Sequence, residues 1–296
     1  MFKVGFILNS RISRKKKFYQ ELDHAKRTLR NVEFTVAETL QAGHAKILTG
    51  VFIKQGFTHL IAVGGDGTLN EVINGFMDQY QEEIVVGLLP YGSANDFAKT
   101  IRSPSNMVDL FEAVSKERSS KIDVGLVQFQ DSKRYFINIA DVGIGASIVQ
   151  RVNKSKKLLG AGFTFFGAIL RTFLSYKNQN INCKTHDWEY EGKVNSLVMA
   201  NGKYFGHGLC IAPDANLADG QLAILISGDI TIWDYIKNVK TVKKGIRVNH
   251  PLLQYKTANK LELTSEVPCG IEADGEFIGT TPATISVAAK KIRFLV

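Results

Sequence analysis

The chain has 296 residues, of which 45% are hydrophobic and 22% charged, a balance that excludes a disordered chain and suffices for one large or two modest cores. Its formal net charge of +9 favours a polyanionic partner, which leaves nucleotides, nucleic acids and anionic membranes open. Its three cysteines, Cys183, Cys210 and Cys269, are far apart, so they predict neither a disulfide framework nor a zinc site and fit a reducing cytoplasm.

Strand-like and helix-like segments alternate through the first 125 residues. Apolar runs predict buried strands at 4–9, 33–38, 59–63 and 84–89. This rhythm predicts an α/β domain built on a Rossmann-like parallel sheet with helices on both faces. Apolar residues spaced three or four apart predict the helices 18–29, 45–55 and 69–77, and a further helix begins at Asn95.

The pattern changes after residue 121, where short strand-like segments separated by turns predict a β-rich second domain. Two helices are expected in it, at 157–176 and 230–247, and the last strand, 291–296, is expected to return to the first domain. The predicted domains are therefore residues 1–124 with 289–296, and residues 125–288. The strands predicted for the second domain are 123–129, 134–140, 193–200, 220–227, 260–264, 276–278 and 283–288.

Two segments bear on membranes. The apolar stretch 158–170 is shorter than the roughly 20 residues of a membrane-spanning helix, and the N-terminus lacks the features of a signal peptide. We therefore expect a cytoplasmic protein that associates peripherally with the inner face of the membrane. Residues 230–247 predict a basic amphipathic helix, which either lies on an anionic leaflet or packs on its domain with a solvated basic back. Its basic residues, Lys237, Lys240, Lys243, Lys244 and Arg247, fall within roughly 120°, beside an apolar face of Ile232, Tyr235, Val239, Val242 and Ile246.

A glycine-rich turn follows the strand at 59–63, which runs directly into Gly64-Gly65-Asp66-Gly67-Thr68 and then a helix. Glycines let backbone amides approach a ligand closely and a helix N-terminus favours anions, so this turn suits a phosphate. Asp66 would repel a bare phosphate. Its carboxylate makes chemical sense beside magnesium, or as an acceptor of a hydrogen bond from ribose or from a loop. The alternative is a tight strand–helix turn with a cap, since the spacings of the dinucleotide and Walker loops are absent.

A second turn of the same kind lies at residues 87–101, GLLPYGSANDFAKTI. A strand leads into Pro90, Gly92 and Ser93, and Asn95-Asp96 opens a helix, for which both residues are equally well explained as caps. Two glycine turns at the ends of successive parallel strands nevertheless point to one ligand site at the carboxyl edge of the sheet.

Together with these turns, four later motifs resemble the bacterial diacylglycerol kinase family of lipid kinases, whose catalytic domain sphingosine and ceramide kinases share. The resemblance extends from about residue 4 to residue 296. It implies an α/β domain and a β-sandwich domain with an ATP site between them. It also implies an ATP- and magnesium-dependent transfer to the hydroxyl of diacylglycerol or a related lipid at the membrane surface. The motifs, in order, are GGDGTLNEV, LPYGSANDFA, KIDVG, FINIADVGIGA, NGKYFGHGLCIAPDANLADGQL and ADGE.

The resemblance also implies which residues bind the nucleotide. Ser93 replaces the threonine that is usual in the family, and Thr39 matches a position near the nucleotide. The first loop, which begins Asn9-Ser10, lacks the usual proline and glycine and departs most from the family pattern. The implied set is Asn9, Ser10, Thr39, Gly64, Gly65, Asp66, Gly67, Thr68, Leu69, Asn70, Ser93, Asn95 and Asp96.

Phosphoryl transfer needs an acceptor for the proton of the attacking hydroxyl. The resemblance gives this role to Glu276, with Asp274 beside it in the site and Asp123 as a further acidic residue. Taken alone, Asp274-Gly275 is a strong hairpin-turn signal, and Asp123 is equally a hydrogen-bonding residue at a strand end.

A magnesium site is implied in the loop 216–221. The resemblance gives the ion the side chain of Asp219 and main-chain oxygens of Asn216 and Gln221, and magnesium prefers oxygen ligands. The alternative is a plain surface turn. His207 replaces a glycine in a neighbouring loop, and we assign it no catalytic role.

Two other functions are weighed against a lipid kinase. An NAD kinase explains residues 64–68 but neither 93–97 nor the DGE segment, and a non-catalytic nucleotide or lipid sensor is supported only by the altered first loop and His207. No nucleic-acid recognition motif is present. The expected partners are therefore a lipid substrate and an anionic membrane, and a homodimer is an ordinary assembly.

Overall fold

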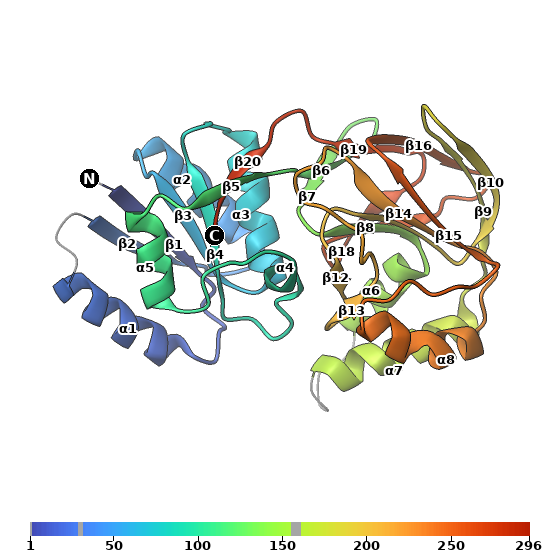
Figure 1. The fold of residues 1–296 in the computed structure, drawn as a ribbon, viewed down its shortest axis with the longest axis horizontal. Coiled ribbons are helices and arrows are strands. Elements are labelled where there is room, and N and C mark those ends of the chain that lie inside the picture. Colours follow the sequence, from blue (N-terminus) through green and yellow to red (C-terminus); the bar gives the residue numbers. More distant parts are fainter. Residues whose placement is uncertain (1, 29–31, 155–160) are drawn as a thin grey trace. The chain divides into compact units, whose positions relative to one another are not determined.

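The computed structural model describes residues 2–28, 32–154 and 161–296. The chain divides into two compact units (Figure 1). The first contains Met1–Ile122 and Lys290–Val296, and the second contains Asp123–Ala289. The C-terminal strand therefore belongs to the first unit.

The first unit is built on a six-stranded sheet in the order β2-β1-β3-β4-β20-β5. All neighbours in it are parallel except β5, which runs antiparallel to β20 at the edge. Because β3 is buried along its whole length, it reads in the sequence as a continuous apolar run. The predicted Rossmann-like α/β fold is confirmed, and β5 was missed. The strands are β1 (Phe2–Leu8), β2 (Val32–Glu38), β3 (His59–Gly64), β4 (Val85–Pro90), β5 (Ser119–Ile122) and β20 (Ile292–Leu295).

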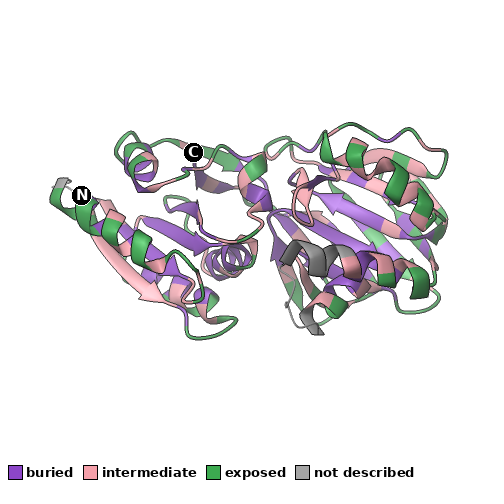
Figure 2. Cartoon of the chain, turned by 90° about the horizontal axis from the view of Figure 1, so that it is seen from below, coloured by how far each residue is buried: buried purple, intermediate pink, exposed green. Residues whose placement is uncertain are grey.

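Helices cover both faces of this sheet (Figures 1 and 2). Helices α1 (Lys15–Thr28) and α5 (Met107–Ser115) pack on the face that carries Phe6. Helices α2 (His44–Lys54) and α3 (Asp66–Asp78) pack together, and α2 lies so close to the sheet that a Cβ at Gly5 would stand 2.5 Å from the Phe52 ring. The short helix α4 (Asp96–Thr100) follows β4.

The strand order sets where loops can gather. The chain leaves β1 for β2 on one side and then passes to β3 on the other side of β1. In open α/β sheets, ligands bind at the carboxyl edge where the winding reverses in this way, because the loops there diverge. The loops after β1 and β3 flank this switch point.

The second unit is an antiparallel β-sandwich, as the resemblance implied. Its sheets have the orders β10-β9-β16-β19-β6-β7 and β15-β14-β11-β8-β17-β18, and a small pair, β12–β13, is separate. Buried residues of both sheets, such as Phe136, Leu197 and Ile271, form one core. The strands are β6 (Gly125–Gln128), β7 (Lys133–Phe136), β8 (Ile139–Gly143), β9 (Gln179–Lys184), β10 (Glu189–Val194), β11 (Ser196–Ala200), β12 (Tyr204–Phe205), β13 (Leu209–Cys210), β14 (Leu222–Ser227), β15 (Leu253–Ala258), β16 (Lys260–Ser265), β17 (Gly270–Ala273), β18 (Glu276–Thr280) and β19 (Ala283–Val287).

Among the described residues of this unit, three helices accompany the sandwich: α6 (Ile144–Lys154), α7 (Ala161–Ser175) and α8 (Ile232–Lys243). The last two correspond to the predicted helices 157–176 and 230–247, although residues 157–160 lie outside the described residues. Helix α6 was missed, although Gly143, with φ 120°, ends β8 directly before it. The single strand expected at 134–140 is two strands, β7 and β8. In the described part of the chain, no helix combines the length and apolar character needed to span a membrane.

Candidate active site

The loops at the carboxyl edge of the first unit's sheet are joined by side chains. Asn9 Nδ2, after β1, donates to Thr68 Oγ1 in α3 at 3.0 Å, over 59 positions of sequence. The Ser10 amide donates to Thr39 Oγ1, after β2, at 3.4 Å. The structure therefore brings these four predicted residues together at the switch point.

The two glycine turns lie against each other. The amides of Tyr91 and Gly92 donate to the Gly64 carbonyl at 2.9 and 3.0 Å. A Cβ at Gly92 would stand 2.4 Å from the Cα of Gly65, so backbone approach requires glycine here. The sequence prediction that both turns belong to one site thus has a physical basis in this contact.

Asp66 also joins the two turns. Its Oδ2 and Oδ1 accept the amides of Asp96 and Phe97, both at 3.0 Å, at the start of α4. Burial raises the pKa of the Asp66 carboxyl above its ordinary value, and these amide hydrogen bonds oppose the rise. Of the roles expected for Asp66, the structure shows one: its carboxylate accepts hydrogen bonds from the amides of a loop.

The N-terminus of α3 offers amides to an anion. Gly65 is its N-cap residue, with extended backbone and no side-chain cap. Among the residues that the structure describes, no group accepts a hydrogen bond from the amides of Gly67 and Thr68. A Cβ at Gly67 would meet no atom within 4 Å, so the space beside the Cα of Gly67 is open. Unsatisfied amides at the positive end of a helix dipole fit a phosphate.

The second turn is closed by Asn95. Its Oδ1 accepts the Gly92 amide at 3.1 Å, and its Nδ2 donates to the Gly92 carbonyl at 3.0 Å, with the backbone in the left-handed region at φ 50°. Asp96 is buried and pairs with Lys99 at 2.6 Å, while Ser93 is exposed. Asn95 therefore shapes the turn, and Ser93 presents a hydroxyl to solvent.

Leu69 and Asn70 differ from the other predicted nucleotide residues because both side chains are fully buried. They support α3 from within the core and do not present side chains to a ligand. Sequence reasoning missed Glu71, whose Oε1 and Oε2 accept the amides of Gly43 and Ala45 at 2.8 and 2.9 Å. Glu71 thereby fixes the start of α2 to α3.

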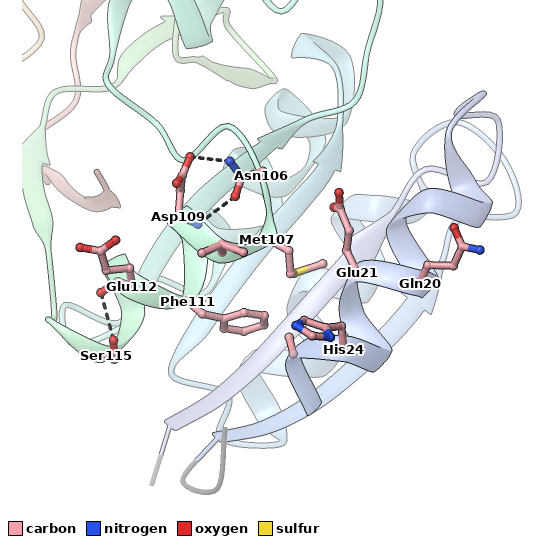
Figure 3. A pocket seen from close by; sticks show the side chains of 11 residues that line it. Gln20, Glu21, His24, Asn106, Met107, Asp109, Phe111, Glu112 and Ser115 are labelled. Atoms are coloured by element: carbon pink, nitrogen blue, oxygen red, sulfur yellow. Dashed lines mark hydrogen bonds between the residues drawn. The ribbon is translucent and has the colours of Figure 1, made fainter. Parts of the chain in front are cut away.

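A cavity of about 890 Å³ lies elsewhere in the first unit, between α1 and α5 (Figure 3). Three carboxylates line it, and each already has a partner: Glu21 accepts from Tyr91 Oη at 2.8 Å, Asp109 from Ser105 at 2.8 Å, and Glu112 from Lys116 at 2.8 Å. Carboxylates repel phosphate groups. We therefore place the candidate phosphate site at the glycine turns and not in this cavity.

In the second unit, Asp274 holds a stretch of backbone. Its Oδ2 accepts the Ile137 amide at 2.8 Å, and its Oδ1 accepts the amides of Asn138 and Ile139, both at 3.0 Å. Asp274 and Gly275 have φ of 48° and 85°, as the hairpin turn between β17 and β18 requires. Because both oxygens bind amides, the geometry favours a positioning role for Asp274.

Asp123 holds the loop 216–221 in a similar way. Its Oδ2 accepts the Gly220 amide at 2.8 Å, and its own amide donates to the Leu217 carbonyl at 2.6 Å. Asn201 Nδ2 donates to the carbonyls of Asp123 and Ile137 at 2.9 and 2.7 Å. One network thus links Asp123, the loop and the segment that Asp274 binds. Asn201 stands in the NGKYFG motif, which is the signal that sequence reasoning passed over.

The loop 216–221 can be tested for its fit to a cation. Asp219 Oδ1 accepts the Gln221 amide at 3.0 Å, and Asn216 Oδ1 accepts the Ala218 amide at 3.1 Å. In the described residues, no three His, Cys, Asp or Glu side chains come together as metal ligands. A magnesium ion here would therefore use main-chain oxygens beside Asp219, as the prediction for Asn216 and Gln221 requires, and an all-oxygen donor set fits this ion.

Glu276 opens β18 with 45% of its side chain exposed. Arg134 Nη2 donates to its Oε2 at 2.6 Å, over 142 positions of sequence. No described group donates to its Oε1. A carboxylate with one oxygen oriented by an arginine and the other open can accept a proton. Arg134 was missed because nothing local in the sequence marks this pair.

Two buried carboxylates also went unnoticed in the sequence. Asp141 of β8 and Glu272 of β17 are cross-strand neighbours, 6% and 0% exposed. Asp141 Oδ1 accepts from Ser196 Oγ at 2.6 Å, and Glu272 Oε2 accepts the Gly275 amide at 2.8 Å. Burial raises the pKa of Asp141 to about 7, and raises that of Glu272 well above its ordinary value. Glu272 thus supports the turn that carries Asp274.

These features define a two-unit protein with two touching glycine turns on an α/β unit and an acidic network on a β-sandwich. A diacylglycerol kinase catalytic domain matches residues 3–127, and a YegS C-terminal NAD kinase beta sandwich-like domain matches residues 138–296. The chain belongs to the bacterial diacylglycerol kinase family of lipid kinases.

Individual relatives agree with this assignment. A diacylglycerol kinase of Staphylococcus carnosus (strain TM300) is 24% identical over 251 residues, which cover 85% of this chain and 80% of the relative. One of Staphylococcus aureus (strain MRSA252) is 24% identical over 285 residues, which cover 96% and 89%. The crystal structure of a diacylglycerol kinase from Bacillus anthracis str. Sterne has the same fold, with a TM-score of 0.72 at 18% identity over 99% of this chain and 96% of that one.

Proposed function

We propose that the chain transfers the γ-phosphoryl group of ATP, with magnesium, to the hydroxyl of diacylglycerol or a related lipid at the membrane surface. The observation that carries the proposal is the pair of touching glycine turns beside the unpartnered amides of Gly67 and Thr68. Membership of a lipid kinase family supplies the class of acceptor.

Several of the predicted residues have a part in this proposal. The amides at the start of α3 bind phosphate oxygens, and Asp66 and Asn95 keep the second turn in place beside them. Magnesium, when bound, neutralises phosphate charge, and the loop 216–221 would hold it. Glu276 accepts the proton of the lipid hydroxyl at its open Oε1, while Arg134 orients its other oxygen.

The test uses radiolabelled ATP, magnesium and fractionated membrane lipids, followed by identification of the labelled product. Glu276→Gln should lower kcat by about 10²–10⁴-fold, since it removes a general base, with ATP binding and Tm close to those of the wild type. Glu266→Gln, which changes an exposed glutamate elsewhere in the second unit, is the control and should keep full activity.

Other outcomes would change the assignment. Full lipid labelling by Glu276→Gln would remove Glu276 from the mechanism. Labelling of NAD and of no lipid would make the protein an NAD kinase, and ATP binding without turnover on any lipid would make it a sensor.

A further inference from the structure

Helix α8 is well bounded but carries no buried residue (Figure 2). A capping box starts it: Thr231 Oγ1 accepts the Asp234 amide at 3.3 Å, and Asp234 Oδ2 accepts the Thr231 amide at 2.9 Å. The helix is therefore locally specified, and its two faces have different surroundings.

The inner face of α8 packs on its own unit. Tyr235, Asn238 and Val242 line a cavity of about 110 Å³ together with Leu225 and Tyr255 of the sheet beneath. The Tyr235 ring also lies 5.6 Å from the ring of Phe173 in α7. Tyr235, Val242 and Ile246, which belong to the apolar face that the sequence placed beside the lysines, line this cavity, so this side of the helix is turned toward the sandwich.

The outer face of α8 consists of Trp233, Ile236, Lys237, Lys240, Lys243 and Lys244. Trp233 is 67% exposed and Ile236 41% exposed, and the four lysines are exposed as well. At about 100° per residue these six positions span roughly 120°. In the described part of the chain no carboxylate pairs with any of the four lysines, whereas nearby Arg247 pairs with Asp214 at 2.6 Å.

The combination of residues indicates what covers this face. A nucleic acid would bind the lysines, but it has no apolar region in which Trp233 and Ile236 would be buried. A bilayer interface accommodates all six, since tryptophan favours the headgroup region and anionic headgroups attract lysine. We propose that the α8 outer face docks the protein on the surface of a bilayer that contains anionic lipid. The inference rests on the proposed lipid kinase function. It names the surface through which the protein contacts the bilayer that contains its lipid substrate.

Vesicle cosedimentation tests the proposal without any catalysis. The variant Lys237→Gln/Lys240→Gln/Lys244→Gln removes three charges from the face, and the control Lys26→Gln/Lys54→Gln/Lys193→Gln removes three from exposed lysines elsewhere. Each lysine near an anionic surface contributes about 5-fold to binding, so the outer-face variant should bind phosphatidylglycerol vesicles about 100-fold more weakly than the wild type. The control should bind as the wild type does. Equal losses in both variants, or equal binding of the wild type to neutral phosphatidylcholine vesicles, would overturn the proposal.

Tryptophan emission reports on the same contact. The chain contains two tryptophans, Trp188 and Trp233, so Trp188→Phe leaves Trp233 as the single emitter. Its emission should shift to the blue on anionic vesicles and be quenched by lipids brominated near the headgroup. Unshifted emission from vesicle-bound protein would show that another surface makes the contact.

A third arm separates this inference from the kinase assignment. On short-chain diacylglycerol dispersed as monomers, the outer-face variant should phosphorylate at the wild-type rate, and its activity should fall only on anionic vesicles. A wild type that binds vesicles but phosphorylates no lipid refutes the kinase and keeps the docking face, whereas a variant that binds vesicles normally refutes the docking face alone. Lysine-dependent binding to duplex DNA, or a dimer that the outer-face substitutions dissociate, would assign the face to nucleic acid or to a second copy.

Discussion

Gly92→Ala should lower stability and Gly67→Ala should not, although each adds one methyl group to the same site. At Gly92 the new Cβ would stand 2.4 Å from the Cα and 2.8 Å from the N of Gly65, which are backbone atoms that cannot swing aside. At Gly67 it would meet nothing within 4 Å. Neither glycine has a positive φ, so the difference is steric.

The magnitudes follow from these contacts. Overpacking of a tight site costs about 1–3 kcal/mol, and replacing glycine restrains the unfolded chain by about 0.4–1 kcal/mol in the opposite sense. Gly92→Ala should therefore lose about 1–2 kcal/mol of unfolding free energy, or about 2–8 °C in Tm. Gly67→Ala lies in the first turn of α3, where alanine is favoured over glycine by up to about 1 kcal/mol, so its Tm should be unchanged or higher.

The affinity for ATP should also differ between the two variants. A methyl group at position 67 takes space beside the open amides, so Gly67→Ala should weaken ATP binding by about tenfold, or ~1.4 kcal/mol. Calorimetric titration with ATP and magnesium, beside thermal unfolding of the same samples, measures both quantities. A Gly67→Ala protein that is stable and binds ATP as the wild type does would refute the assignment of phosphate to these amides.

Three further variants test the supporting contacts. Because burial raises the pKa of Glu272 in the folded state, the native protein keeps a proton that the unfolded chain releases above about pH 4.5, and stability falls as pH rises beyond it. Glu272→Gln, which keeps an acceptor for the Gly275 amide, should be more stable than the wild type at pH 8 in urea unfolding, with the difference vanishing near pH 4; parallel pH profiles would contradict this. Asp274→Ala leaves three backbone amides without their acceptor and should lose about 3 kcal/mol or more in urea unfolding, so a wild-type midpoint would show that the turn does not depend on them. Glu71→Ala removes the acceptor of two amides at the start of α2 and should lose about 1–2 kcal/mol, measured as a lower Tm, whereas Glu33→Ala on the exposed side of β2 should lose less.

The sequence predicts the first unit well because its central strands are buried on both faces. Such strands appear as apolar runs that end at turn residues, so the strands β1, β3 and β4 and the place of both glycine turns can be inferred from local pattern. The contact between the turns cannot be inferred from local pattern, because it depends on a close approach between the backbones of Gly65 and Gly92.

The second unit is harder because long-range bonds decide its local structure. The apolar segment 134–140 looks like one strand, yet it is interrupted where the amides of residues 137–139 turn toward Asp274, as many as 137 positions away. Helix α6 follows β8 directly, and the single Gly143 at the junction, with φ 120°, was not recognised as the end of the strand. The Arg134–Glu276 pair is equally distant in sequence, so no spacing rule reveals it.

The predicted acidic residues of the two units can be ranked by what their oxygens bind. Asp66 and Asp274 accept backbone amides through both oxygens, and Asp123 accepts one that fixes the loop 216–221. Oxygens committed to amides hold loops in place and are poorly placed to take a proton from a substrate. Among the residues that the structure describes, Glu276 binds only the side chain of Arg134, so we propose it as the proton acceptor. Substitution of Glu276 should therefore lower the rate with little loss of stability, whereas substitution of Asp274 should lower the unfolding free energy first and the rate as a consequence.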